Sequence, residues 1–285
     1  MRTGWNTIRL TLVLLCLSPI VTSLQEDMED PSPHVEVTLV AEQNGVQEGG
    51  LIWLGVHLDI EDPWHLYWKG KSDTGMPISL SLQSPEGTEL GEVLWPAPTR
   101  YTASKNFLDH VYSKEVTLLF PMAVDPSLPP GTDLEVAVRH EWLVCQKETC
   151  LLGSGTASLS VPILKKEETP GWSERVEWFR ATRARLPQTM PSDSERREDG
   201  QAILRRYWQN GDLVLHAPEA SQMVFYPHER STPVHDLKKN GFARGDRMTL
   251  SPVHSPSVSA RLTGIIEIHW PDNPPFFYFL EEIKP

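Results

Sequence analysis

The chain has 285 residues, a formal net charge of −12 and only three cysteines. The excess of acidic residues disfavours nucleic acids and anionic membrane surfaces as partners. Its 25 prolines and 18 glycines favour many short elements joined by turns over a few long helices.

The N-terminus resembles a secretory signal peptide. Arg2 and Arg9 precede an apolar run at residues 10–17, and Pro19 and Val21-Thr-Ser23 follow with small or tolerated residues at the cleavage positions, so we expect cleavage after Ser23. The run is too short to span a bilayer, which takes about 18 apolar residues or more. Cys16 raises the alternative of a lipoprotein, but the preceding Val-Leu-Leu lacks the small residue that lipoprotein processing prefers.

Cleavage after Ser23 removes two arginines and no acidic residue, so the mature chain carries 24 basic and 38 acidic residues and a net charge of −14. No later segment is apolar enough to predict a membrane span. We therefore expect a mature chain that is soluble outside the cytosol.

Residues 34–164 predict a first β-sandwich domain. Apolar side chains alternate with polar ones in six runs, which is typical of strands with one buried face: residues 35–39, 52–60, 78–82, 116–120, 134–144 and 159–163. Gly, Pro and Asn separate the runs, and this spacing favours an antiparallel sandwich of the immunoglobulin-like kind.

Residues 165–200 predict a short amphipathic helix, capped by Ser173, and a linker. Strand-like runs return in residues 201–285, which predict a second, smaller β-sandwich. Asn210-Gly211 and Asn240-Gly241 are hairpin signals within it. The expected fold class is mainly β, with two immunoglobulin-like antiparallel sandwiches joined by a helix and linker.

Cys145 and Cys150 are the only cysteines of the mature chain. If residues 134–144 form a strand and the return strand begins near Leu151, the cysteines flank a turn at residues 146–149. Opposed residues of antiparallel strands lie about 4.5 to 5.5 Å apart, which suits a disulfide. The spacing alone leaves three hypotheses open: a hairpin staple, a thiol–disulfide exchange pair and a metal site.

Other chemistry has little support in the sequence. The ten histidines show no His-Glu-x-x-His pattern, and no glycine-rich phosphate loop or serine nucleophile elbow is present. We therefore expect no bound cofactor and no metal centre of the hydrolase type.

Several motifs resemble one family. They are Trp142-Leu-Val-Cys145, Pro63-Trp64-His-Leu-Tyr67-Trp68, Asp73-Thr-Gly75-Met-Pro77 and Leu94-Trp95-Pro96. Together they look like the periplasmic N-terminal domain of the DsbD thiol–disulfide interchange family. Met223-Val-Phe225-Tyr-Pro227 and Leu262-Thr-Gly264 extend the resemblance to the branch that includes the copper-tolerance protein ScsB.

The resemblance implies a component of a protein-disulfide reductase. Its domain takes electrons from a thioredoxin-like protein or a membrane electron-conduit protein and passes them to oxidised periplasmic proteins. Cys145 and Cys150 then cycle between dithiol and disulfide, with Cys150 as the reachable thiol and Cys145 as the resolving one. The sequence ends at Pro285 without the conduit of the fused relatives, so we expect the donor on a separate polypeptide.

The family also shields its disulfide with an aromatic loop, and residues 107–112 match that loop by position. Phe107 and Tyr112 are the cap candidates and Tyr67 is a candidate cleft neighbour, although all three could simply pack in the sandwich. The alternative function is a non-catalytic envelope binding protein with a structural disulfide. It could be linked to copper through the cysteines and His110 or His140, since thiolates suit Cu(I).

Overall fold

A computed structural model of the chain describes residues 32–285, except 103–106, 148, 193, 196–202 and 254–258. The predicted signal peptide and Cys16 lie outside the described residues. Residues 31–285 belong to one compact unit. Within the described part, no helix is both long and apolar enough to cross a membrane.

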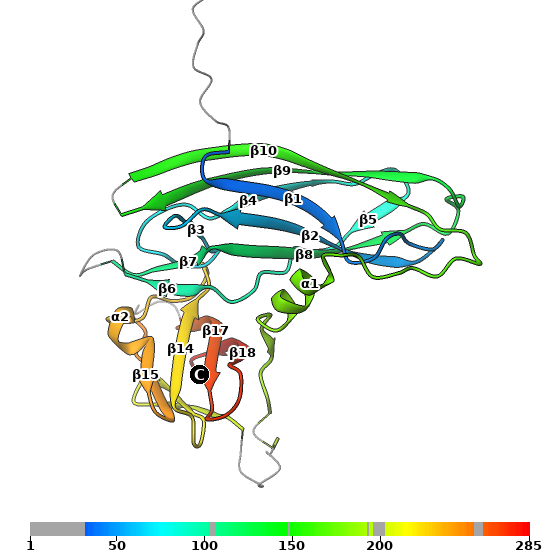
Figure 1. Ribbon diagram of the computed structural model, residues 1–285. Coiled ribbons are helices and arrows are strands. Elements are labelled where there is room, and N and C mark those ends of the chain that lie inside the picture. Colours follow the sequence, from blue (N-terminus) through cyan, green and yellow to red (C-terminus); the bar gives the residue numbers. More distant parts are fainter. Residues whose placement is uncertain (1–31, 103–106, 148, 193, 196–202, 254–258) are drawn as a thin grey trace, which may run out of the picture. The chain divides into compact units, whose positions relative to one another are not determined.

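The first half is a sandwich of two antiparallel sheets (Figure 1). One sheet has the order β1-β2-β8-β5, with bounds β1 Val35–Ala41, β2 Leu51–Ile60, β8 Glu115–Val124 and β5 Thr88–Leu90. The other has the order β10-β9-β3-β7-β6, with β4 also paired to β9. Its bounds are β10 Thr149–Pro162, β9 Asp133–Gln146, β3 His65–Tyr67, β7 Asp109–Ser113, β6 Thr99–Tyr101 and β4 Ser79–Gln83.

The inner faces of these two sheets share one apolar core. It takes alternate residues of β2, β8 and β9, among them Leu54, Phe120 and Val138, as period-two patterning requires. Trp142 lies in this core, and its ring stacks on His140 with centroids 4.8 Å apart. Gly153 and Gly155 face these rings from β10, where a Cβ atom would come within 3 Å of them. The predicted sandwich is therefore confirmed.

The chain between the two halves contains helix α1 (Val176–Arg183), which packs on β8. Phe179 is buried with Leu119 and Val40, and the Thr182 hydroxyl donates to the Thr117 carbonyl. The helix begins after Arg175 and has no side-chain cap, so the predicted capping by Ser173 is wrong. The helix begins at Val176, so Arg175 and not Ser173 occupies the N-cap position.

The second half has its own core between two further sheets. The larger has the order β11-β18-β17-β14-β15, with bounds β11 Gln188–Thr189, β18 Phe276–Ile283, β17 Arg261–His269, β14 Gln222–Pro227 and β15 Phe242–Arg244. The smaller has the order β12-β13-β16, with bounds β12 Arg205–Gln209, β13 Asp212–His216 and β16 Arg247–Leu250. All pairs are antiparallel except β11 with β18.

The two hairpin signals have different outcomes. Asn210 and Gly211 have φ of 51° and 92° and join β12 to β13, as a two-residue hairpin turn requires. Asn240 instead ends the short helix α2 (Leu237–Asn240), and Gly241 has φ −79°. The second hairpin prediction is therefore wrong, because a helical turn occupies that connection.

The two cores touch. Val224, Tyr226, Ile265 and Phe277 of the second half belong to the core cluster of the first. A mainly β fold with a helix and linker between two sandwiches is what the sequence predicted. The exact domain boundaries at 164 and 201 stay a prediction.

We predict that Gly153→Ala lowers the free energy of unfolding by about 1 to 3 kcal/mol, because the added Cβ atom would lie 2.5 Å from Nε1 of the Trp142 indole. Urea denaturation checks this. The control is Ser154→Ala, one exposed residue further along the same strand, where we expect a change within about 0.5 kcal/mol. Equal stability of the two variants would show that Trp142 does not need the space.

Candidate functional site: the Cys145–Cys150 disulfide

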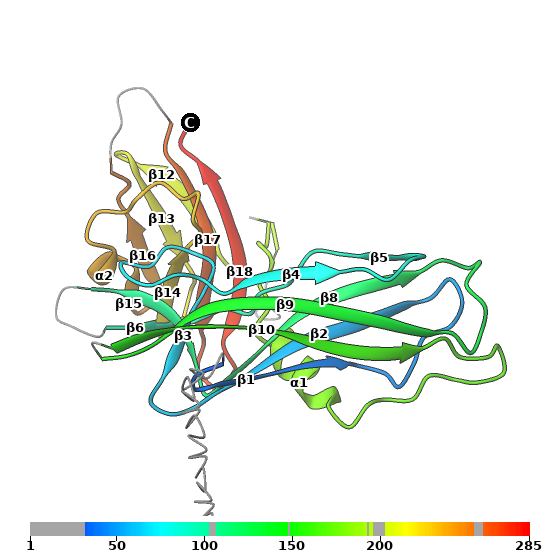
Figure 2. The ribbon, with the colours of Figure 1, turned by 90° about the horizontal axis from the view of Figure 1, so that it is seen from above.

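The two cysteines form a disulfide across the long β9–β10 hairpin, with Cα atoms 4.1 Å apart. They are directly opposed in the strand register, and the strands continue past them to Gln146 and from Thr149. Only two residues separate the paired positions Gln146 and Thr149, which is the spacing of a two-residue hairpin, so the expected four-residue turn is wrong. Lys147 has φ 46°, the left-handed conformation that such turns use. Figure 2 shows β9 and β10 running side by side toward this turn.

Strand alternation places the disulfide on the outer face of its sheet. The even-numbered residues of β9, such as Trp142 and Val144, point into the core. Cys145 therefore points the other way, and Cys150, as its opposed partner, shares that face. The disulfide is separated from the core by the sheet itself.

The two sulfur-bearing residues differ sharply in exposure. Cys145 is 1% exposed, whereas Cys150, on the edge strand β10, is exposed. Cys145 is covered by a small cluster that contains Tyr67 and Val111, with Tyr101 and Leu143 packed against it. A reagent from solvent meets the Cys150 side of the bond first.

His65 completes this cluster. It is the residue of β3 directly opposed to Cys145, and its ring lies 4.3 Å from that of Tyr101 and 5.4 Å from that of Tyr67. Burial lowers the pKa of His65, and the carboxylate of Asp109 opposes that effect. Burial also raises the pKa of Tyr67, so its phenol stays neutral.

Sequence reasoning missed His65, although a signal was present. In the motif from Trp64 to Trp68, the core takes Trp64, Leu66 and Trp68. The two residues between them, His65 and Tyr67, must then share the opposite face. Tyr67 was expected beside the cleft, and His65 lies two residues before it.

The predicted cap residues occupy different environments. Phe107 is 48% exposed just before β7, while Tyr112 is buried in the sandwich core and its hydroxyl donates to the Pro96 carbonyl. Tyr67 is buried in the cluster of Cys145. The structure therefore brings Tyr67 to the disulfide, and most of the predicted loop is strand β7. A capping role for the three residues stays a prediction.

Hydrogen bonds fix the segment around Asp109. Its two carboxylate oxygens accept bonds from the Thr74 backbone N–H at 2.8 Å and the Thr74 hydroxyl at 2.7 Å. The Leu108 N–H donates to Asp73 at 2.7 Å. These bonds tie β7 to residues 73–74 and hold the wall of the cluster in place.

The histidines considered for copper do not lie on this face. His140 and His110 alternate toward the opposite side of the sheet from Cys145 and Val111. Burial lowers the pKa of His110 to about 4, and its Nδ1 faces the Lys71 carbonyl. Among the described residues, no group of three or more His, Cys, Asp or Glu side chains is arranged to hold a metal ion.

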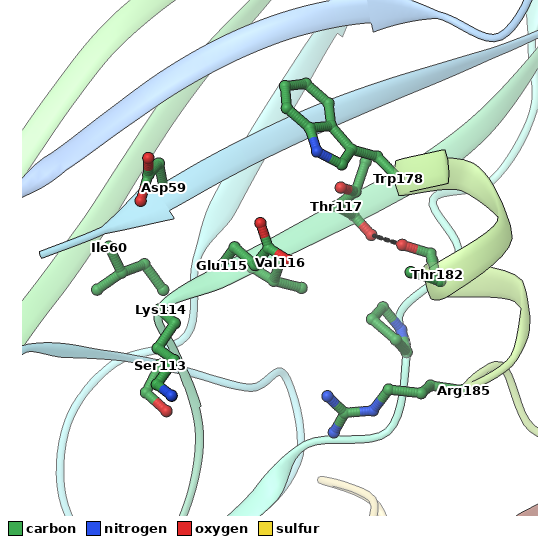
Figure 3. A pocket seen from close by; sticks show the side chains of 12 residues that line it. Asp59, Ile60, Ser113, Lys114, Glu115, Val116, Thr117, Trp178, Thr182 and Arg185 are labelled. Atoms are coloured by element: carbon green, nitrogen blue, oxygen red, sulfur yellow. Dashed lines mark hydrogen bonds between the residues drawn. The ribbon is translucent and has the colours of Figure 1, made fainter. Parts of the chain in front are cut away.

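A pocket of about 440 Å³ lies elsewhere, beside α1 and the adjoining ends of β2 and β8 (Figure 3). Ile60 and Val116 are among the residues that line it. Asp59 and Glu115 line it together with Lys114 and Arg185, so neither charge sign dominates. It contains no cysteine and none of the predicted site residues.

Comparison with known proteins shows which domain the part that carries the disulfide is similar to. Residues 36–162 match the family model for the N-terminal domain of the thiol:disulfide interchange protein DsbD. This part of the chain therefore resembles a DsbD N-terminal domain, as its motifs predicted. A comparison with curated proteins found no match.

The solved structures extend the likeness beyond residue 162. The N-terminal periplasmic domain of ScsB from Proteus mirabilis superposes with a TM-score of 0.54 at 15% identity, covering 88% of this chain and 94% of that one. The chain thus shares the fold of the ScsB domain over most of its length. The reduced N-terminal domain of DsbD from Neisseria meningitidis gives a TM-score of 0.30 at 12% identity, covering 52% of this chain and 97% of that one.

We predict that, after reduction, iodoacetamide modifies Cys150 at least about tenfold faster than Cys145, because only an accessible thiolate reacts. Tryptic cleavage after Lys147 puts the two cysteines on separate peptides, so mass spectrometry follows each one. In urea the two rates should converge. Equal rates in the folded protein would contradict the exposure difference.

Proposed function

We propose that the chain is a thiol–disulfide exchange module of the bacterial envelope. It receives electrons from a thioredoxin-like or membrane electron-conduit protein and passes them to oxidised envelope proteins through Cys145 and Cys150. The observation that carries the proposal is a disulfide with one exposed and one buried sulfur, on the outer face of a domain that resembles a DsbD N-terminal domain.

The exposure difference assigns an order to the chemistry. A donor thiolate attacks the Cys150 sulfur, the Cys145–Cys150 bond breaks, and its electron pair leaves on the Cys145 sulfur. The second donor thiol then attacks the mixed disulfide and releases Cys150. Both cysteines end reduced and the donor ends as a disulfide, so two electrons and two protons have moved.

The surface beside Cys150 suits a protein partner. Leu152 lies on the same face two residues further along β10 and is 70% exposed. It is opposed to Leu143, which packs against the cluster of Cys145. An exposed apolar side chain next to the reachable sulfur provides contact area for the docking of a redox protein.

Several observations support the envelope location. The family that matches acts in thiol–disulfide interchange, and the ScsB relative is described as a periplasmic domain. Disulfides also persist in oxidising compartments such as the periplasm. The expected signal peptide also indicates export from the cytosol.

The competing hypothesis is a binding protein in which the bridge is a staple. Closing a loop between cysteines five positions apart stabilises a protein by only about 2 kcal/mol in the chain-entropy model. The hairpin is already held by fourteen opposed residue pairs and by its packed core face. The fold therefore has little need of the staple, which favours exchange.

We predict that Cys145→Ala traps a mixed disulfide through Cys150 when it is incubated with a thioredoxin-like protein that keeps only its exposed cysteine and is activated with Ellman's reagent, because neither protein then has a resolving thiol. Non-reducing gels and mass spectrometry detect the adduct. The matched variant Cys150→Ala should give at most about a tenth as much adduct, since its remaining thiol is buried.

Failure of Cys145→Ala to form any adduct, with the variant folded by circular dichroism, would overturn the exchange function. Equal trapping by the two variants would overturn the order of attack instead.

A further inference from the structure

Exchange requires the buried sulfur of Cys145 to gain and lose a proton. Whenever the disulfide opens or closes, the Cys145 sulfur changes between a thiolate and a thiol, and a thiolate with no partner is costly in a buried site. Cys150 can exchange its proton with water because it is exposed. Cys145 is covered by Tyr67 and Val111 and needs another route.

His65 is placed to provide that route. It is opposed to Cys145 in the β3–β9 register, and opposed residues of an antiparallel pair have their side chains adjacent on one face. Its side chain is 3% exposed, and neither ring nitrogen has a hydrogen-bond partner among the described residues. A buried polar group without a hydrogen-bond partner destabilises the fold, so its retention calls for an explanation.

Among the described residues, the groups around His65 leave both ring nitrogens available for proton transfer. Tyr67 lies on the same strand and Tyr101 comes from β6, and both offer only ring contacts. The residue of β7 that is opposed to His65 is Ser113. The carboxylate of Asp109, also on β7, accepts hydrogen bonds from Thr74. Burial lowers the pKa of His65 below its ordinary value, so the imidazole is a neutral base at neutral pH.

We propose that His65 takes and returns the proton of the Cys145 thiol during exchange. The inference rests on the proposed function. In the electron-donating direction, the Cys150 thiolate attacks an acceptor disulfide and one acceptor thiolate leaves. His65 then removes the Cys145 proton, and the Cys145 thiolate attacks the Cys150 sulfur. The mixed disulfide breaks, its electron pair leaves on the second acceptor sulfur, and the imidazolium gives its proton to that sulfur, which leaves as a thiol.

The test measures the resolution step alone. Reduced full-length protein is mixed with oxidised glutathione, quenched with acid at set times, and the Cys150–glutathione adduct and the closed disulfide are counted by mass spectrometry. In His65→Phe, which keeps a ring but no nitrogen, we expect resolution at pH 7 to slow by about 100-fold, within the usual range for general bases. Adduct formation at Cys150 should be unchanged.

The pH profile separates proton transfer from a packing effect. In the wild type, resolution should level off above the pKa of His65, because the base is then neutral. In His65→Phe, it should rise about tenfold per pH unit up to the thiol pKa, ordinarily about 8.5. The control is His140→Phe, a buried histidine on the opposite face of β9, which should resolve like the wild type. His65→Gln replaces His65→Phe if the latter does not fold.

The outcomes are distinct. Equal resolution rates and equal pH profiles in the wild type and the folded His65 variant would overturn the role of His65 and leave the exchange function intact. A wild-type protein that forms neither an adduct nor a closed disulfide with glutathione or a thioredoxin-like protein would overturn both. Slowing by His140→Phe to the same degree would show a general loss of packing and would also overturn the proposal.

Discussion

The register of β9 between β3 and β10 is the constraint on which the site depends. Because side chains alternate along a strand, a single register puts Trp142 and Val144 in the core and Cys145 on the outer face. The same register opposes Cys145 to Cys150 on one side and to His65 on the other. A slip of one residue would bury the sulfur pair in the core and remove its chemistry.

This arrangement separates stability from reactivity. The core face of β9 and β10 is filled by large side chains, and two glycines of β10 make room for the rings of Trp142 and His140. The outer face carries a small aromatic cluster that covers one sulfur and leaves the other exposed. The disulfide can open without emptying the core, because the strands are held by their ladder and by packing on the other face.

The sequence predicted the parts of this account that depend on local pattern. Alternation along residues 134–144 identified the buried face of β9, and Asn210-Gly211 identified a hairpin whose backbone only such residues adopt readily. The sequence patterns gave wrong or missing predictions where contacts between residues far apart in the chain determine the structure. Asn240-Gly241 lies at a helix end, and the helix after Ser173 begins two residues later than its polar flank suggested. His65 was missed because its opposition to Cys145 joins strands 80 positions apart in the chain.

The central claim is that the Cys145–Cys150 bond exchanges in the folded protein. The most direct measurement is the rate at which a reduced thioredoxin-like protein reduces this bond under native conditions, with circular dichroism recorded in parallel. The account predicts complete reduction while the β-sheet signal is unchanged. A bond that resists reduction until the protein is unfolded in denaturant would show that it is a structural staple and would contradict the account.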